Sequence, residues 1–268
     1  MLALQHRVWA EGEATVAYAW KRAAAFWRQA AGLAALLLWV GTAAAAETVD
    51  LELILAVDVS RSIDDEEAAL QREGYAEAFR HPAVINAIQS NPNRRIAVAY
   101  VEWAGTHYQK LTIPWTIISD AASGERYASV IMSQPRVSER WTSISGAIDF
   151  SMRVFAISPY QGTRRVIDIS GDGVNNNGRP SSQARDEALA AGVTINGLVI
   201  MNDRPTPGFS EYFSQPALDV FYREQVVGGP GAFVVAIEDF TTFAYAIRNK
   251  LIREIANLDH PVDVAAND

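Results

Sequence analysis

Apolar runs alternate with amphipathic segments along the chain from Leu51 onward. The apolar runs predict strands, whereas apolar positions at helical spacing predict helices. The predicted strands are residues 51–58, 95–103, 106–115, 164–170, 193–200 and 232–237. The predicted helices are residues 64–79, 118–133, 143–156, 181–192 and 240–256. The strand at 106–115 is short and is expected to end at Pro114. Proline cannot donate a backbone hydrogen bond to a neighbouring strand, so we place this strand at the edge of the sheet.

This order of elements predicts an α/β fold. Strands that are apolar on both faces and interleaved with helices indicate a mainly parallel sheet covered on both sides. We therefore expect a doubly wound, six-stranded sheet with one short antiparallel edge strand. Residues 47–258 would form a single domain, with an elaborated connection at 202–231 that contains a short helix. Residues 259–268 are expected to form a flexible tail.

The N-terminal segment differs from the rest of the chain. Lys21, Arg22 and Arg28 precede the apolar stretch "AAGLAALLLWVGTAAAA". Basic residues, an apolar core and small residues at a cleavage site are typical of a signal peptide, and we expect cleavage after Ala46. The protein would then be exported, to the periplasm or outside the cell, without a membrane span. An uncleaved membrane anchor is the alternative, because the apolar stretch is near the short end of a spanning helix.

Composition narrows the possible chemistry. The 268 residues contain no cysteine, which excludes disulfides, zinc–thiolate sites and thiol catalysis. The formal net charge of −8 argues against a nucleic-acid-binding protein.

Two aspartates mark the expected functional edge of the sheet. Asp58 ends the first strand, and Asp172 follows the strand 164–170 in "SGDGVNNNG". Ligands of doubly wound sheets lie at the carboxyl ends of strands where the strand order reverses. If the strand order is 3-2-1-4-5-6, the two carboxylates face one crevice, where a cation would relieve their repulsion.

Hydroxyl groups near these carboxylates favour a hard cation. Ser60 and Ser62 follow Asp58 in "DVSRS", and Thr142 precedes the helix 143–156. Oxygen ligands with few carboxylates suit Mg²⁺, and Mn²⁺ or Ca²⁺ could substitute. Each piece also has a plainer interpretation. Ser62 or Asp64 could cap the first helix, Thr142 could cap its own, and Asp172 could belong to an ordinary turn.

The motifs Asp58-x-Ser60-x-Ser62, Thr142 and "ISGDG" with Asp172 resemble the metal-ion-dependent adhesion site (MIDAS) of von Willebrand factor type A (VWA) domains. The resemblance covers residues 50–256. "VEWAG" and "RRVIDISGDGVNN" more narrowly resemble an uncharacterised family of exported bacterial proteins with this domain. The resemblance implies that these five residues hold the cation, Asp172 mainly through water, and that an Asp or Glu carboxylate of a partner protein completes its coordination.

Other polar residues lie near the same edge in sequence. Glu102 and Trp103 end the second strand, and Gly173, Asn175 and Asn176 follow Asp172, so these five are candidates for partner contact. Packing for Trp103 and turn formation for the asparagines are the alternatives. Asp168, inside an apolar strand, is expected to satisfy local hydrogen bonds.

An enzymatic alternative is a Mg²⁺-dependent phosphohydrolase similar to haloacid dehalogenases, with Asp58 as nucleophile. That chemistry needs a second acid two residues later, and this position is Ser60. It also needs a lysine, and Lys110 in the predicted edge strand is the only one between the motifs. We therefore expect a protein-binding module without catalytic residues. The sequence does not define the partner or the oligomeric state.

Overall fold

The computed structural model describes residues 46–201, 217–238 and 242–256. Six strands in these residues form one sheet, in the order β3-β2-β1-β4-β5-β6. Only β3 is antiparallel to its neighbour; all other pairs are parallel. The predicted fold class and strand order are therefore confirmed. The strands are β1 (Glu47–Asp58), β2 (Ile96–Trp103), β3 (Gln109–Ile118), β4 (Tyr160–Gly171), β5 (Thr194–Ile200) and β6 (Val234–Ile237).

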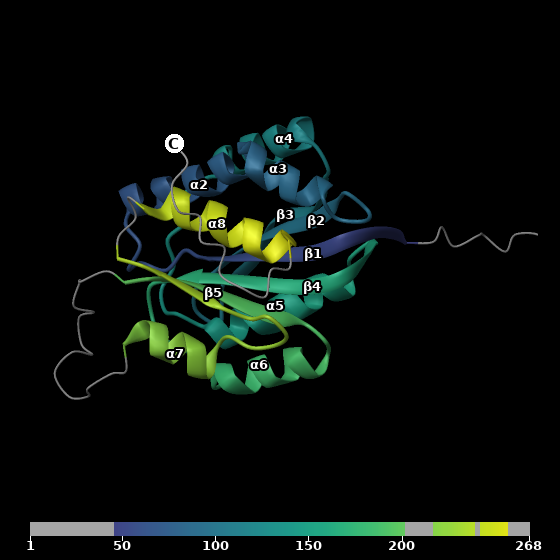
Figure 1. The fold of residues 1–268 in the computed structure, drawn as a ribbon. Helices are drawn as coiled ribbons and strands as arrows, with labels where there is room; N and C mark the ends of the chain where they lie inside the picture. Colours follow the sequence, from purple (N-terminus) through teal and green to yellow (C-terminus); the bar gives the residue numbers. More distant parts are fainter. Residues whose placement is uncertain (1–45, 202–216, 239–241, 257–268) are drawn as a thin grey trace, which may run out of the picture. The chain divides into compact units, whose positions relative to one another are not determined.

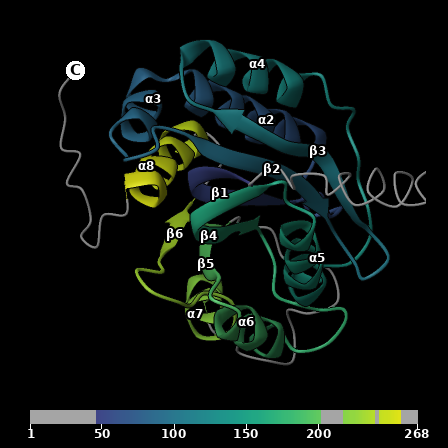
Figure 2. The ribbon, with the colours of Figure 1, turned by 90° about the vertical axis from the view of Figure 1, so that its right-hand side faces the viewer.

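Helices cover both faces of the sheet (Figures 1 and 2). The described helices are α2 (Asp65–Arg80), α3 (Pro82–Gln89), α4 (Ala121–Met132), α5 (Ile144–Ala156), α6 (Ser181–Ala190), α7 (Leu218–Gln225) and α8 (Phe243–Ala256). Helices α2, α3, α4 and α8 pack on one face, and α5, α6 and α7 pack on the other. Strand β1 lies in the middle and is buried on both sides. Its Leu53 and Leu55 join the first core, whereas Ile54 and Ala56 join the second.

Local sequence signals fix several helix ends. Asp64 caps α2 in a capping box, because its side chain accepts from Glu67 N while the Glu67 side chain accepts from Asp64 N. Ser143 caps α5 by accepting from Gly146 N. Gly192 follows α6 with φ +75°, a conformation that glycine adopts without a steric penalty.

Two elements differ from the sequence prediction. Helix α3 was not predicted; Pro82 stands at its first turn, and the His81 side chain accepts from Ala83 N as its cap. Strand β3 does not end at Pro114 but continues to Ile118. The register between β2 and β3 shifts beside Pro114, where Tyr100 pairs with Ile113, and an edge strand tolerates proline at such an irregularity.

Several predictions fall outside the described residues. These are the signal peptide apart from Ala46, residues 202–216 of the elaborated connection, and the tail at 259–268. Helix α7 is the short helix expected in that connection. Among the residues that the structure describes, no helix is both long enough and apolar enough to cross a lipid bilayer.

Candidate metal centre

Two neighbouring strands deliver carboxylates to one edge of the sheet. Strand β1 ends at Asp58 and β4 at Gly171, and their register pairs Val57 with Ser170. Parallel strands point the same way, so Asp58 and Asp172 leave the sheet side by side. We call Asp58, Ser60, Ser62, Thr142 and Asp172 the candidate metal centre.

The Asp58 carboxylate is buried with one oxygen unmatched. Its side chain is fully shielded from solvent. Oδ1 accepts from Ser60 N at 2.7 Å, whereas Oδ2 has no hydrogen-bond partner among the described residues. Burial raises the pKa of Asp58 well above its usual range, and the negative charge of Asp172 raises it further, against the opposing hydrogen bonds from Ser60. A cation at Oδ2 would compensate this buried charge.

Hydrogen bonds join the first loop to the loop after β4. Ser60 Oγ and Ser62 Oγ lie 2.9 Å apart, and Ser62 Oγ donates to Asp172 Oδ1 at 2.7 Å. Ser62 is exposed and Asp172 is half-buried, so this chain of oxygens runs from the interior to the surface. Residues 110 positions apart in the sequence therefore share one small polar cluster.

The segment 139–143 brings Thr142 to the same place. Glu139 N donates to Val59 O at 3.0 Å, which ties this segment to the loop after β1. Thr142 N donates to Asn176 Oδ1 at 2.8 Å, and Thr142 O accepts from Asn176 N at 2.9 Å. A Cβ atom on Gly173 would lie 3.6 Å from Thr142 Oγ1, which places this hydroxyl beside the loop that carries Asp172.

Thr142 is not the cap of α5, because Ser143 has that role. In the described part of the chain its hydroxyl has no hydrogen-bond partner, although Thr142 is only 6% exposed. A hydroxyl without a partner on a largely buried residue remains available as a ligand.

The donor set fits a hard divalent cation. Two carboxylates and three hydroxyls converge, and all are oxygen ligands. No group of three or more His, Cys, Asp or Glu side chains gathers as a metal site within residues 46–201, 217–238 and 242–256. The centre instead uses neutral hydroxyls where many metal sites use carboxylates, which leaves a bound cation with more positive charge.

Gly171 and Tyr222 complete the inner side of the centre. A Cβ on Gly171 would lie 2.8 Å from Tyr222 Oη and 3.0 Å from Asp58 Oδ2, so only glycine fits there. The Tyr222 hydroxyl is buried and has no hydrogen-bond partner among the described atoms. Burial raises its pKa well above the usual range, and the charges of Asp58 and Asp172 add to this effect. The sequence did not suggest Tyr222, because it reaches the centre from α7.

Two of the five predicted contact residues are wrongly placed. Glu102 is 4% exposed and Trp103 is fully buried, so neither presents a surface to a partner. Glu102 accepts from Thr112 Oγ1 at 2.9 Å, and Trp103 packs against the backbone at Gly171. Residues after β2 and segment 139–143 cover the end of that strand, because Gly105 N donates to Arg140 O and Ser143 N donates to Ala104 O.

The asparagines of the loop after β4 support its backbone. Asn176 Oδ1 accepts from Thr142 N, and Asn175 Oδ1 accepts from Ser145 N at 3.1 Å. Their side chains therefore hold the loop against the start of α5. Contact of Gly173, Asn175 and Asn176 with a partner stays a prediction.

The sequence alone did not predict three exposed residues around the centre. We call them the rim: Arg61, Arg140 and Trp141. Neither guanidinium has an ion-pair or hydrogen-bond partner in the described part of the chain, and both side chains are exposed. Trp141 is 57% exposed and has φ +69°, which is unusual for a bulky residue and is found at functional sites. Their position in sequence was the available signal: Arg61 stands between Ser60 and Ser62, and Arg140 and Trp141 precede Thr142.

Residues 48–259 match the family described as "Protein of unknown function (DUF1194)". No curated protein matches the sequence.

Solved structures share the fold. Proximal thread matrix protein 1 from the mussel byssus, with a zinc-occupied MIDAS motif, is 16% identical, and the match covers 78% of this chain and 48% of that one with a TM-score of 0.58. The von Willebrand factor type A structure from Catenulispora acidiphila is 15% identical, with coverage of 78% and 43% and a TM-score of 0.54. The pilus adhesin SpaC from Lactobacillus rhamnosus GG is 13% identical, and the match covers 78% of this chain and 31% of that one with a TM-score of 0.56.

The chain spans less than half the length of each of these structures, and identities this low establish a shared fold alone. The predicted resemblance is confirmed at that level. The chain belongs to the family described as "Protein of unknown function (DUF1194)", and its fold is that of von Willebrand factor type A domains.

Proposed function

We propose that the protein is an exported, non-catalytic binding module that captures a carboxylate of a partner protein through a divalent cation, with Mg²⁺ the first candidate. One observation carries the proposal. The buried, unmatched Oδ2 of Asp58 lies beside the Ser60–Ser62–Asp172 hydrogen-bond chain and the partnerless hydroxyl of Thr142. A cation bound at this place would compensate the buried charge of Asp58.

The residues of the candidate metal centre would hold the cation. A bound cation would supply electrostatic attraction for an external carboxylate, because hydroxyl ligands do not neutralise it. The zinc-occupied MIDAS motif of the mussel protein supports a divalent ion at this place in the fold. Mn²⁺, Ca²⁺ and Zn²⁺ are the alternatives to Mg²⁺.

The rim supports an acidic partner. Arg61 and Arg140 are exposed cations without ion-pair partners in the described part of the chain. They would attract a protein segment that carries acids besides the one on the metal. Trp141 offers an exposed aromatic surface beside Thr142, and tryptophan is enriched among residues that dominate binding energy.

The phosphohydrolase alternative receives no support from the geometry. Asp58 is fully buried, and its Oδ1 is bonded to Ser60 N. Position 60 is a serine, so the second acid is missing, and Lys110 is an exposed residue of the edge strand β3.

Affinity capture from the native exported fraction tests the proposal. The immobilised protein is compared in Mg²⁺ and in chelator, as wild type, Thr142→Ala and Arg61→Glu. A bound protein should require Mg²⁺, disappear with Thr142→Ala and weaken with Arg61→Glu. Thr116→Ala, whose hydroxyl only donates to Pro114 O, is the matched control and should bind normally.

Two outcomes contradict the proposal. One is capture that persists in chelator and in Thr142→Ala. The other is Mg²⁺-dependent hydrolysis of a phosphate ester that Asp58→Asn abolishes, which would favour the enzymatic alternative.

A further inference from the structure

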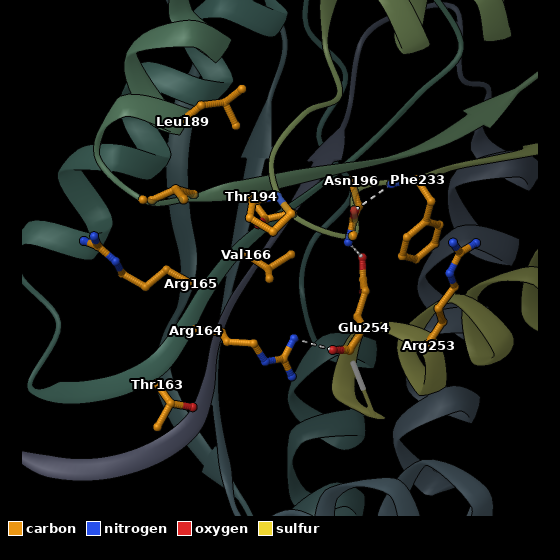
Figure 3. Close-up of a pocket in the computed structure, with 14 residues that line it drawn as sticks. Thr163, Arg164, Arg165, Val166, Leu189, Thr194, Asn196, Phe233, Arg253 and Glu254 are labelled. Atoms are coloured by element: carbon orange, nitrogen blue, oxygen red, sulfur yellow. Dashed lines mark hydrogen bonds between the residues drawn. The ribbon is translucent and has the colours of Figure 1, made fainter. Parts of the chain in front are cut away.

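A pocket of about 380 Å³ lies at the opposite end of β4 from the candidate metal centre (Figure 3). The starts of β4 and β5, the loop before β6 and the end of α8 form its walls. Arg164 in the pocket and Asp172 at the metal centre are eight residues apart on one strand and its following loop, roughly 25 Å at the rise of a β-strand. The pocket is thus a separate site.

Arg253 supplies an uncompensated positive charge to this pocket. Its guanidinium carbon lies 3.8 Å from the centroid of the Phe233 ring, which orients the side chain along an aromatic wall. Its Nε is buried and has no hydrogen-bond partner in the described part of the chain, and no carboxylate there forms an ion pair with it. A buried donor of this kind gains a partner only from a ligand or from water.

Arg164 holds a second positive charge at the same wall. Its Nη1 donates to Glu254 O at 2.9 Å and its Nη2 to Ile255 O at 3.0 Å, so the end of α8 fixes the guanidinium. Figure 3 shows this group directed toward α8 between the strand and the helix. A fixed guanidinium loses little conformational entropy when it binds an anion.

The pocket as a whole is basic. Arg165 is a third lining arginine, and Glu254 is the single acidic lining residue among those described. One oxygen of the Glu254 carboxylate is engaged, because Oε1 accepts from Asn196 Nδ2 at 2.8 Å and also from Lys250 Nζ, whereas the buried Oε2 has no hydrogen-bond partner among the described residues. Phe233 and Val166 add apolar surface. Arginines beside an aromatic ring and aliphatic side chains suit an organic anion better than a bare inorganic ion.

We propose that this pocket binds a small organic anion, whose carboxylate or phosphate group lies between Arg253 and Arg164 and whose apolar body packs on Phe233. The volume is at the lower end of the range for small-molecule sites, so the ligand is small. The site is independent of the candidate metal centre and of its proposed function.

Backbone amide NMR titration of the protein, expressed from the full-length sequence, tests this proposal. The probes are benzoate for the carboxylate source, phenyl phosphate for the phosphate source, and inorganic phosphate. We expect saturable shifts at Thr194, Asn196 and Phe233 with benzoate or phenyl phosphate, and weaker ones with inorganic phosphate. The probe with the lower Kd identifies the head group.

Variants at the arginine make the test specific. Arg253→Gln should weaken binding about tenfold or more, and Arg253→Lys should weaken it less, because lysine keeps the charge but lacks the flat, forked donor group. Arg248→Gln is the matched control, since Arg248 is on the same helix but lies over Tyr245 and contacts His81. Asp58→Ala and chelator should leave binding unchanged.

Two results overturn the proposal. One is the absence of saturable shifts up to about 50 mM of each probe, far above the millimolar range of weak ligands. The other is binding that Arg253→Gln and Arg248→Gln affect equally while both variants keep the wild-type Tm.

Discussion

Two carboxylate clusters, one in the middle of β4 and one at the carboxyl ends of β1 and β4, have different surroundings. Asp168, in the middle of the strand, faces Glu254 of α8, and Lys250 lies with them. Lys250 Nζ is 2.6 Å from Asp168 Oδ1 and also bonds Glu254, and all three side chains are shielded from solvent. At the end of the sheet, Asp172 accepts from the Ser62 hydroxyl, whereas Asp58 Oδ2 is buried and has no hydrogen-bond partner among the described residues.

The difference indicates what each cluster does. A buried charge is costly unless an opposite charge compensates it. In the interior the fold supplies that charge from Lys250, which attaches α8 to the sheet. At the edge, Asp58 Oδ2 has no partner among the described residues, and a cation from solution would compensate its charge. The interior cluster is therefore structural, and we propose that the cluster at the edge binds a cation.

We expect the largest effect on stability from a substitution in the interior cluster of Asp168, Lys250 and Glu254. Lys250→Met removes its only lysine and leaves two carboxylates together in the core. We expect the free energy of unfolding to fall by about 3–5 kcal/mol, the range for breaking a buried ion pair. Urea unfolding measures this loss. Lys110→Met, on the exposed side of edge strand β3, is the control and should leave the midpoint unchanged. Equal stability of the two variants would show that the interior lysine is not needed.

Removing the charge of Asp58 from the cluster at the edge of the sheet should raise the free energy of unfolding instead of lowering it. Because the pKa of Asp58 is raised in the folded state, its ionised form opposes folding at neutral pH. Asp58→Asn should therefore stabilise the protein in chelator, because asparagine has no charge to bury. The same variant should lose any stabilisation by Mg²⁺. Destabilisation in chelator, measured by urea unfolding, would show that the carboxylate already has a compensating partner.

We expect a smaller effect of pH on the free energy of unfolding, through titration of Asp168. Burial raises the pKa of Asp168 to about 7, with the charge of Glu254 adding and Lys250 opposing. The folded state therefore binds this proton more tightly than the unfolded state. The contribution to stability is fully present below the unfolded-state pKa and is lost as pH rises through about 7. We expect a loss of about 1 kcal/mol between about pH 6 and pH 8.

Asp168→Asn should remove this pH dependence. The comparison is made in an Asp58→Asn background and in chelator, so that titration of Asp58 does not contribute. An unchanged slope of unfolding free energy against pH in Asp168→Asn would assign the pH dependence to another group.

The fold and the candidate metal centre were largely predictable from sequence. Each residue of the centre stands at the end of a strand or the start of a helix, and in a parallel sheet these positions meet at one edge. Glu102 and Trp103 also end a strand, yet they are buried because the segments after β2 and before α5 cover them. That cover depends on loop conformation, which local patterns do not encode.

The interior cluster and the basic pocket were not predictable. Asp168 is more than 80 residues from Lys250 and Glu254, and their meeting depends on how α8 is rotated on the sheet. The pairing of Arg253 with Phe233 likewise joins α8 to the loop before β6. An apolar stripe shows which face of α8 packs, but not which strand residues lie under each turn.

Titration calorimetry of Mg²⁺ binding tests whether the candidate metal centre holds a cation. We expect one ion per chain, no binding in Thr142→Ala, and a gain in unfolding free energy of about 2.7 kcal/mol at Mg²⁺ a hundredfold above its Kd. Thr116→Ala should bind like the wild type. If Mg²⁺, Mn²⁺, Ca²⁺ and Zn²⁺ all fail to bind, or if Thr142→Ala binds them as the wild type does, these residues do not form a metal site.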